Sequence, residues 1–266
     1  AEDPCFRTEI DRQTHEMIIY GMSELHLNTI LARMAKKFKV EVDTKLPKIS
    51  YRETITRTVS DFHRHKKQSG GSGEFAEVHL RLSPYTEDNF LFLDALKGDG
   101  VRRQFVPSVE KGCKSTMELG ILTGSPVIHI KAEFYDGKDH PVDGKDSAFQ
   151  KAASMCFKKC FLAANPVLLE PIVEMEIVFP SAFSGEVNQF LNGHRGRIQG
   201  MDASGSDQVL RASVPLAECQ TFSTDLRSMT QGQGSFSMSL KGYEAVPPQI
   251  QQTVIEQWQR EQDADE

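Results

Sequence analysis

Apolar and polar residues alternate through the middle of the chain with the two-residue period of half-buried strands. In residues 78–82, Val78, Leu80 and Leu82 alternate with His79 and Arg81. A second alternation follows Pro126 and places these apolar residues on one face: Ile128, Ile130, Ala132 and Phe134. Both segments predict strands with one buried side.

Two segments of the same region have the helical period instead. Residues 104–119 place Val109, Cys113 and Met117 on one side. A longer helix begins at Asp146 or Ser147, either of which could cap it. Its apolar stripe is formed by Phe149, Ala152, Ala153, Cys156, Phe157, Cys160, Phe161 and Ala164. The stripe predicts a packed core, and the helix ends before Pro166, because proline disfavours a helical conformation in the preceding residue.

The last region predicts strands and helices in a βαββαβ order. The elements cover residues 173–179, 185–191, 197–201, 208–214, 217–227 and 235–240. In this order both helices can pack on one face of a four-stranded sheet. Pro247 and Pro248 then open a terminal helix through Trp258, since proline is tolerated in a first turn. Ile250, Val254 and Trp258 lie on one side of this helix, and we expect them to dock on the body.

The first 48 residues show only the latter part of such an order. Residues 6–10 and 17–20 predict a hairpin, Ser23 could cap a helix, and residues 40–42 predict a return strand. The first strand and helix of a βαββαβ unit are missing from this order. We therefore expect the chain to be a fragment that begins inside a domain, and this segment to be the least ordered part in solution.

A glycine-rich stretch lies between two strands of the middle region. Residues 68–74 have the sequence QSGGSGE, and Arg64, Lys66 and Lys67 lead into it. A phosphate-binding loop should open a helix, whose N-terminal amides face the phosphate, whereas a strand follows here. The stretch therefore predicts an exposed tip that approaches a polyanionic partner. The alternative is a flexible hairpin with incidental lysines.

Composition limits the partners and the compartment. The 266 residues have a net charge of −6, which argues against a general polyanion binder but not against local contact through loops. No apolar run approaches the roughly 20 residues of a membrane span, so we expect no membrane partner. The five cysteines, an odd number, indicate reduced thiols of a cytoplasmic protein.

A series of motifs resembles the elongation factor G family of translational GTPases. The sequence GMSELHL at residues 21–27 is similar to a domain III signature. The sequences YRETI (51–55), QSGGSG (68–73) and YDGKDHPVD (135–143) are similar to the first strand and the two tip loops of domain IV. The sequences NGHRG (192–196) and TDLRSMTQGQGS (224–235) are similar to domain V.

The resemblance implies a multi-domain fold of the α+β and α/β classes. Residues 1–48 would be a partial, ferredoxin-like domain III, and residues 49–171 a domain IV like the second domain of ribosomal protein S5. Residues 172–266 would be a ferredoxin-like domain V with a C-terminal helix.

The resemblance also implies a function. The chain would be the C-terminal, ribosome-binding part of a monomeric cytoplasmic factor whose tip loops enter the ribosomal A site and promote translocation of transfer RNA and messenger RNA. His140 would contact these RNAs, and domain V would contact the sarcin–ricin loop and the L11 region. The implied RNA-contacting residues are Lys66, Lys67, Gly70, Gly71, Ser72, Gly73, Glu74, His140, Pro141, Val142, Asp143, Arg195, Gly196, Arg197, Arg227, Gly232 and Gly234.

No phosphate-binding GxxxxGK pattern followed by Ser or Thr occurs in the sequence. We therefore expect no cofactor and no GTP hydrolysis in this chain; GTP and Mg²⁺ are expected in a missing N-terminal domain. The short string from Asp202 to Gly205 resembles a GTPase motif, but it predicts a turn between strands. For Arg195, Arg197 and Arg227 the alternative role is to organise a helix end.

Two acidic residues depart from the family's pattern. Glu74 stands where glutamine is usual in the first tip loop, and Glu77 replaces a histidine. Because an ionised carboxylate cannot donate a hydrogen bond and repels phosphate, these residues favour a paralogue with a specialised role. Ribosome recycling, ribosomal protection and an S5-fold kinase-like enzyme remain alternatives, and His140 could be an ordinary solvated histidine.

Overall fold

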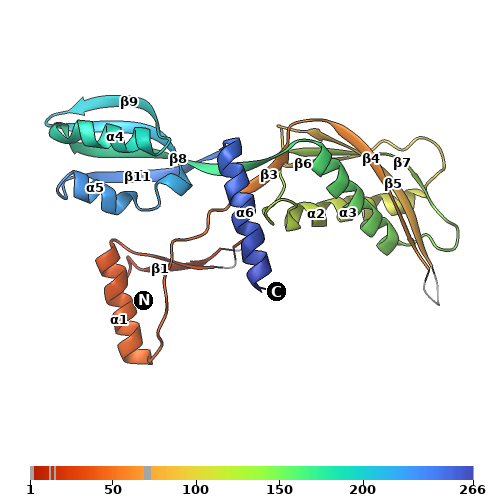
Figure 1. Ribbon diagram of the computed structural model, residues 1–266, viewed down its shortest axis with the longest axis horizontal. Coiled ribbons are helices and arrows are strands. Elements are labelled where there is room, and N and C mark those ends of the chain that lie inside the picture. The colour runs from red at the N-terminus through yellow and green to blue at the C-terminus, as the bar shows by residue number, and fades with distance from the viewer. Residues whose placement is uncertain (1–2, 12, 15, 69–72, 266) are drawn as a thin grey trace. The chain divides into compact units, whose positions relative to one another are not determined.

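The computed structural model describes residues 3–265, apart from 12, 15 and 69–72. Its contacts divide the chain into two compact units, each built from two segments. One unit combines Tyr51–Leu169 with Ala245–Glu266, and the other combines Ala1–Ser50 with Glu170–Glu244. The long strand β8 (Pro166–Pro180) begins in the first unit and continues into the second. Figure 1 labels the elements of both units.

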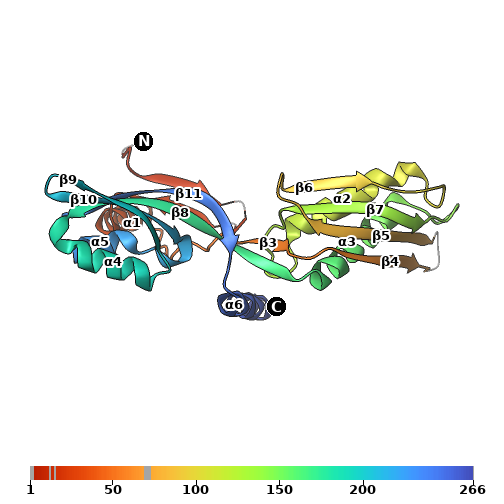
Figure 2. The same ribbon diagram turned by 90° about the horizontal axis from the view of Figure 1, so that it is seen from above.

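The first of these units is a four-stranded sheet with two helices on one face (Figures 1 and 2). The strand order is β4 (Val59–Lys67), β5 (Glu74–Pro84), β7 (Ile130–Lys138) and β6 (Phe90–Asp94). The pairs are antiparallel except for β6 and β7, which are parallel. The helices are α2 (Val106–Leu119), preceded by a 3₁₀ turn at Arg103–Phe105, and α3 (Asp146–Ala163).

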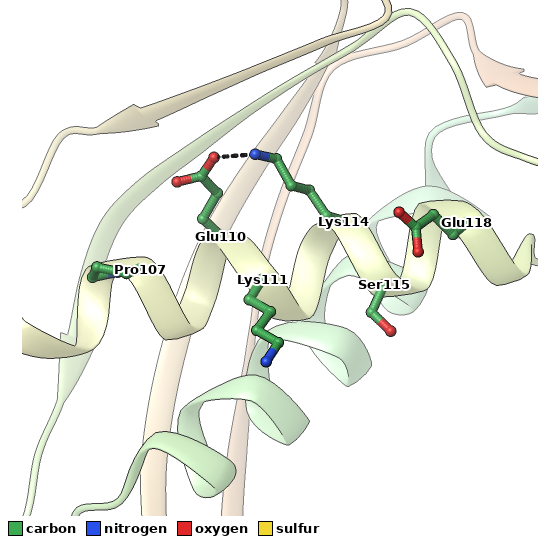
Figure 3. A pocket seen from close by; sticks show the side chains of 6 residues that line it. All are labelled: Pro107, Glu110, Lys111, Lys114, Ser115 and Glu118. Atoms are coloured by element: carbon green, nitrogen blue, oxygen red, sulfur yellow. Dashed lines mark ion pairs between the residues drawn. The ribbon is translucent and has the colours of Figure 1, made fainter.

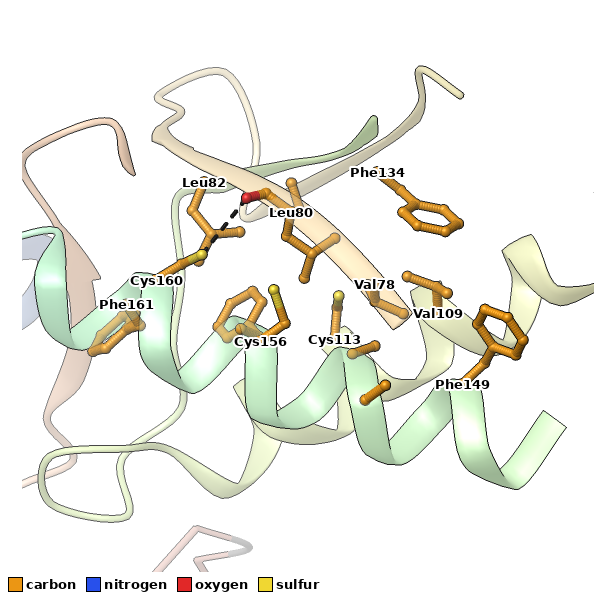
Figure 4. Packing of buried hydrophobic residues seen from close by; sticks show 14 of the residues in the cluster. Val78, Leu80, Leu82, Val109, Cys113, Phe134, Phe149, Cys156, Cys160 and Phe161 are labelled. Atoms are coloured by element: carbon orange, nitrogen blue, oxygen red, sulfur yellow. Dashed lines mark hydrogen bonds between the residues drawn. The ribbon is translucent and has the colours of Figure 1, made fainter. Parts of the chain in front are cut away.

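The core lies between the sheet and the two helices, as the alternation predicts. Val78, Leu80 and Leu82 of β5 are fully buried against the stripe of α3 (Figure 4). The thiols of α3 take part in this packing: Cys160 Sγ lies 3.6 Å from the carbonyl oxygen of Leu80. Burial raises the pKa of the Cys113 thiol, which keeps it protonated.

Two local predictions in this unit are wrong. The expected caps, Asp146 and Ser147, lie inside α3, and the N-cap position is taken by Lys145, whose side chain does not cap the helix. Asp146 instead accepts a hydrogen bond from Ser108 (2.6 Å). The strand expected from Pro126 begins only at Ile130, because His129 has a left-handed backbone conformation (φ 61°) that interrupts it.

Glu53 lies on β3 (Arg52–Ile55), which pairs with the beginning of β8. Its carboxylate is fully buried and accepts hydrogen bonds from backbone amides of the segment between α2 and β7. The donors are the amides of Ile121 (2.8 Å), Leu122 (2.9 Å), Thr123 (2.9 Å) and Ser125 (3.2 Å). Burial raises the pKa of Glu53, and the four amides oppose that rise.

The terminal helix α6 (Pro248–Asp265) continues past Trp258, where we expected it to end, and contacts residues of Tyr51–Leu169. Its Gln251 side chain accepts a hydrogen bond from the amide of Leu168 (3.0 Å), and the Trp258 indole lies against Gly124. These contacts place α6 with Tyr51–Leu169, although we assigned it to a domain of residues 172–266. The division 1–48, 49–171 and 172–266 itself stays a prediction.

The other unit contains the predicted βαββαβ order. The sheet order is β11 (Ser235–Ala245), β8, β10 (Asp207–Pro215) and β9 (Arg197–Ser204). The helices are α4 (Ser184–Gly193) and α5 (Phe222–Met229), with short 3₁₀ turns at Ser181–Phe183 and Leu216–Glu218. This is the ferredoxin-like arrangement, and the predicted fold class is confirmed. Gly205 (φ 67°) makes the predicted turn between β9 and β10.

The N-terminal segment contains the predicted hairpin, β1 (Arg7–Ile10) with β2 (Met17–Tyr20), and the helix α1 (Glu24–Phe38). Ser23 caps this helix by accepting a hydrogen bond from the His26 amide (3.1 Å). The strand predicted at residues 40–42 is wrong, because this stretch has no regular secondary structure, is exposed and pairs with no described strand. The low order predicted for this segment stays a prediction.

Candidate nucleic-acid interface

Gly73, the last residue of the first predicted tip loop, lies beside Asp143 of the second at one end of the β4–β5–β7–β6 sheet. The Phe75 amide donates a hydrogen bond to the carbonyl oxygen of Asp143 (2.9 Å). A side chain on Gly73 would place its Cβ 2.8 Å from an Asp143 carboxylate oxygen, so glycine permits this close approach. Gly70, Gly71 and Ser72 lie outside the described residues.

His140 is held in one orientation by the backbone of its own loop. Its Nδ1 accepts hydrogen bonds from the amides of Asp143 (3.1 Å) and Val142 (3.4 Å). In the neutral imidazole the proton is therefore on Nε2, which is a donor. The side chain is 48% exposed, so this donor is available to a ligand.

A contact from outside the loop fixes its base. The Arg102 guanidinium binds the carboxylate of Asp139 and donates a hydrogen bond to the carbonyl oxygen of His140 (3.2 Å). Val142, at 78% exposed, projects from the loop, and Pro141 is exposed beside it. The arrangement presents His140 and Val142 on a braced turn.

Glu74 does not present a free carboxylate to a ligand. It binds Lys151 Nζ (2.9 Å) and Ser147 Oγ (3.3 Å) of α3, and His65 Nε2 (2.9 Å) of β4. The hydrogen bond from Lys151 is the largest cause that lowers the pKa of Glu74 to about 2. The carboxylate is therefore ion-paired, and its bonds connect the start of β5 to α3, while the role of Glu74 in RNA contact stays a prediction.

Glu77 is also removed from any RNA-contacting position. Its side chain is 3% exposed and pairs with Arg64 (2.5 Å), His79 (3.2 Å) and Lys138 (3.8 Å). These partners lower its pKa against the effect of burial, so the carboxylate is an interior counter-ion. Lys66 and Lys67, at the end of β4, are exposed.

Arg195 organises a helix end. Its Nη1 and Nη2 bind both oxygens of the buried Glu170 (2.6 and 2.9 Å), and its Nε binds Glu218 (2.8 Å). These bonds raise the pKa of Arg195. The Gly196 amide closes the end of α4 on the carbonyl oxygen of Leu191 (2.7 Å). We therefore leave Arg195 and Gly196 out of the candidate surface.

The other candidate RNA-contacting residues of the βαββαβ unit lie where α4 and α5 end, and both helices end on the same side of such a fold. Arg197 is 72% exposed and pairs with Glu244 (2.6 Å). Arg227 is exposed and donates a hydrogen bond to the carbonyl oxygen of Met22 (3.2 Å). Gly232 (φ 81°) and Gly234 form the turn before β11.

Sequence reasoning missed the residues that hold the tips together. Phe75 has its ring 6.1 Å from that of His140, and Arg102 and Lys151 come from segments distant in the sequence. The alternation of β5 could have placed Phe75 on the side away from the core, but no local pattern identifies the partners of Arg102 or Lys151.

A hollow elsewhere in the described residues carries no comparable arrangement. It lies along one side of α2 and is lined by Pro107, Glu110, Lys111, Lys114, Ser115 and Glu118 (Figure 3). Glu110 and Lys114 form an ion pair across one helical turn (2.6 Å). An open hollow with charges of both signs is an ordinary solvated helix side.

Three family models match consecutive parts of the chain. They describe elongation factor G domain III (residues 1–46), elongation factor G domain IV (47–165) and the elongation factor G C-terminus (167–254). None of the helices in the described residues combines the length and apolarity needed to cross a membrane.

Two relatives agree with these matches. An elongation factor G-like protein of Thermotoga maritima is 43% identical over 261 residues, which is 97% of this chain and 38% of the relative. A crystal structure of a Thermus thermophilus protein superimposes with a TM-score of 0.87 at 37% identity, covering 97% of this chain and 39% of that one. The chain thus spans under half the length of these relatives. Its sequence and its fold both place it in the elongation factor G family.

Proposed function

We propose that this chain is the ribosome-binding part of an elongation factor G-like translational GTPase. In this proposal the two turns beside Gly73 and His140 enter the ribosomal A site and promote movement of transfer RNA and messenger RNA. The observation that carries it is the braced, exposed His140, whose Nε2 can donate to phosphate or to a base edge. In this proposal the described residues bind RNA and hold the tip loops in position.

The remaining partners follow from the same proposal. Arg197 and Arg227 would contact ribosomal RNA near the sarcin–ricin loop and the L11 region. GTP and Mg²⁺ would bind in the part of the relatives that this chain does not cover. The paired charge of Glu74 removes the objection that a carboxylate at the tip repels RNA.

The test is single-round translocation by the full-length protein with His140→Asn. A hydrogen bond to a charged group contributes about 1.5–3 kcal/mol, so translocation should slow roughly 10- to 150-fold. His129→Asn is the matched control, because His129 and His140 flank β7 at its opposite ends. GTP hydrolysis on the ribosome should be unchanged in both variants.

The same preparation separates translocation from the alternatives. If the protein splits ribosomes with recycling factor but does not support translocation, the proposed ribosome partner is right and the proposed translocation step is wrong. Equal translocation rates for His140→Asn and the control would remove His140 from the mechanism.

A further inference from the structure

The β4–β5–β7–β6 sheet has a second face that α2 and α3 do not cover. The two helices pack on the side of Val78, Leu80 and Leu82. Strand alternation therefore puts His79 and Arg81 on the opposite side, which we call the open face. Figure 2 looks onto the four strands with the helices behind them.

Aromatic side chains from neighbouring strands meet on the open face. The ring of Phe62 (β4) stacks on that of His79 (β5), with centroids 5.1 Å apart and an interplanar angle of 20°. His79 meets Tyr135 (β7) edge to face at 5.9 Å, and the Arg81 guanidinium lies 5.3 Å from the Tyr135 centroid. Phe62 is 48% exposed, and the Lys159 ammonium of α3, itself 51% exposed, lies 5.7 Å from the centroid of this ring, so a flat group that stacks on Phe62 meets a cation as well.

Cations outnumber carboxylates around these rings. The register places five cations on the open face: Arg64, Lys66, Arg81, Lys131 and Lys138. Three carboxylates accompany them: Glu77, Asp136 and Glu133. Glu77 pairs with both Arg64 and Lys138, and Glu133 with both Arg81 and Lys131. A polyanion therefore meets a net positive surface.

The open face continues to the tip. Phe75 and His79 lie on the same side of β5, four residues apart, or about 13 Å along a strand. The Phe75 ring contacts that of His140 at 6.1 Å. A strand of nucleic acid held at His140 can therefore follow β5 to the Phe62–His79 pair.

We propose that the open face binds single-stranded RNA. An unpaired base stacks on Phe62 beside His79, and the backbone phosphates pass Arg81 and Lys131. Aromatic residues on a four-stranded sheet bind unpaired bases in this way, whereas the bases of a duplex are already stacked. Only the identity of the bound RNA, as ribosomal RNA or messenger RNA, rests on the proposed function.

The first test measures the affinity of the 266-residue chain for a labelled oligouridylate by fluorescence anisotropy at about 50 mM salt. Phe62→Ala should weaken binding about tenfold, the loss expected for one stacked base. Met155→Ala is the matched control, because Met155 is 47% exposed and lies on α3, on the other side of the sheet. Melting curves check that all variants are folded.

The second test places a fluorescent reporter at the stack. In a Trp258→Phe background, which removes the natural tryptophan, Phe62→Trp should be quenched by oligouridylate but not by duplex RNA. Met155→Trp in the same background should respond to neither. Equal affinity of Phe62→Ala and Met155→Ala, equal quenching by duplex RNA, or no binding by the unaltered chain would overturn the inference.

These outcomes are distinct from those of the tip hypothesis. If His140→Asn slows translocation while Phe62→Ala leaves RNA affinity unchanged, the tips act without the open face. If Phe62→Ala weakens binding and His140→Asn has no effect on translocation, the open face is an RNA site and the proposed function fails.

Discussion

Replacing Glu53 should destabilise the Tyr51–Leu169 unit more than any exposed charge in it. The carboxylate is fully buried, and four backbone amides between Ile121 and Ser125 donate to it. Glu53→Ala leaves these donors without an acceptor. Each buried, unsatisfied donor costs about 1–3 kcal/mol, although the segment can move to reach water.

We therefore expect Glu53→Ala to lower the free energy of unfolding by about 3–5 kcal/mol, the range for breaking a buried charged network. Glu53→Gln should cost about 2–3 kcal/mol, because its single carbonyl oxygen accepts from only part of the donors and its NH₂ group faces the rest. Glu110→Gln is the control, since an ion pair within a helix contributes about 0.3–0.5 kcal/mol.

The assay is urea unfolding followed by the fluorescence of Trp258. This is the single tryptophan of the sequence, and its indole lies against Gly124, inside the segment that Glu53 holds. With a slope of about 1–3 kcal/mol per molar urea, the midpoint of Glu53→Ala should fall by more than about 1 M. If the urea midpoint of Glu53→Ala fell no further than that of Glu110→Gln, the buried hydrogen bonds of Glu53 would not stabilise the unit as predicted.

Two further predictions concern charges. Arg195→Ala should destabilise the ferredoxin-like unit by about 3–5 kcal/mol, because it leaves the buried Glu170 carboxylate without its counter-ion. The control Arg197→Ala should destabilise the same unit by under about 1 kcal/mol. Equal midpoints of the two variants in thermal melts followed by circular dichroism would contradict this prediction. Folding lowers the pKa of Glu74 from 4.5 to about 2. The ionised Glu74 side chain therefore stabilises the fold fully at pH values above 4.5, and this contribution is lost as the pH falls toward 2. The difference in melting temperature between the unaltered chain and Glu74→Gln should therefore shrink over that window, and a difference independent of pH would contradict the assignment.

The sequence predicts those elements whose pattern follows from burial. The alternation from Val78 to Leu82 predicts β5, because one face of the sheet is covered and the other is not. Five of the six elements of the βαββαβ unit have one apolar side against a shared core, whereas β9 contributes no residue to that core and is mostly exposed. The strand expected at residues 40–42 fails, since a strand needs a hydrogen-bonded neighbour and local propensity cannot supply one.

The candidate site is predicted only in part. The tip loops are evident from their glycines and from the resemblance, but the state of each charge depends on residues distant in the sequence. Glu74 becomes part of a network through Lys151 of α3, and Arg195 is enclosed by Glu170 and Glu218. Arg197, two residues from Arg195, is largely exposed. Residue type alone therefore cannot distinguish an arginine that could contact phosphate from one that stabilises a helix end.

In the proposed function, the turn that presents His140 contacts RNA in the ribosomal A site. Val142 is 78% exposed on that turn, so an iron chelate attached through Val142→Cys can cleave neighbouring RNA with hydroxyl radicals. Cys5, the exposed cysteine among those described, is first changed to serine, and Leu162→Cys on α3, 57% exposed, is the control tether.

The measurement is made with the full-length protein bound to ribosomes. We expect Val142→Cys to cleave small-subunit RNA that lines the A site, and Leu162→Cys to give a different or weaker pattern. If cleavage from Val142→Cys misses this RNA, or matches that of the control tether, the turn at His140 does not enter the A site.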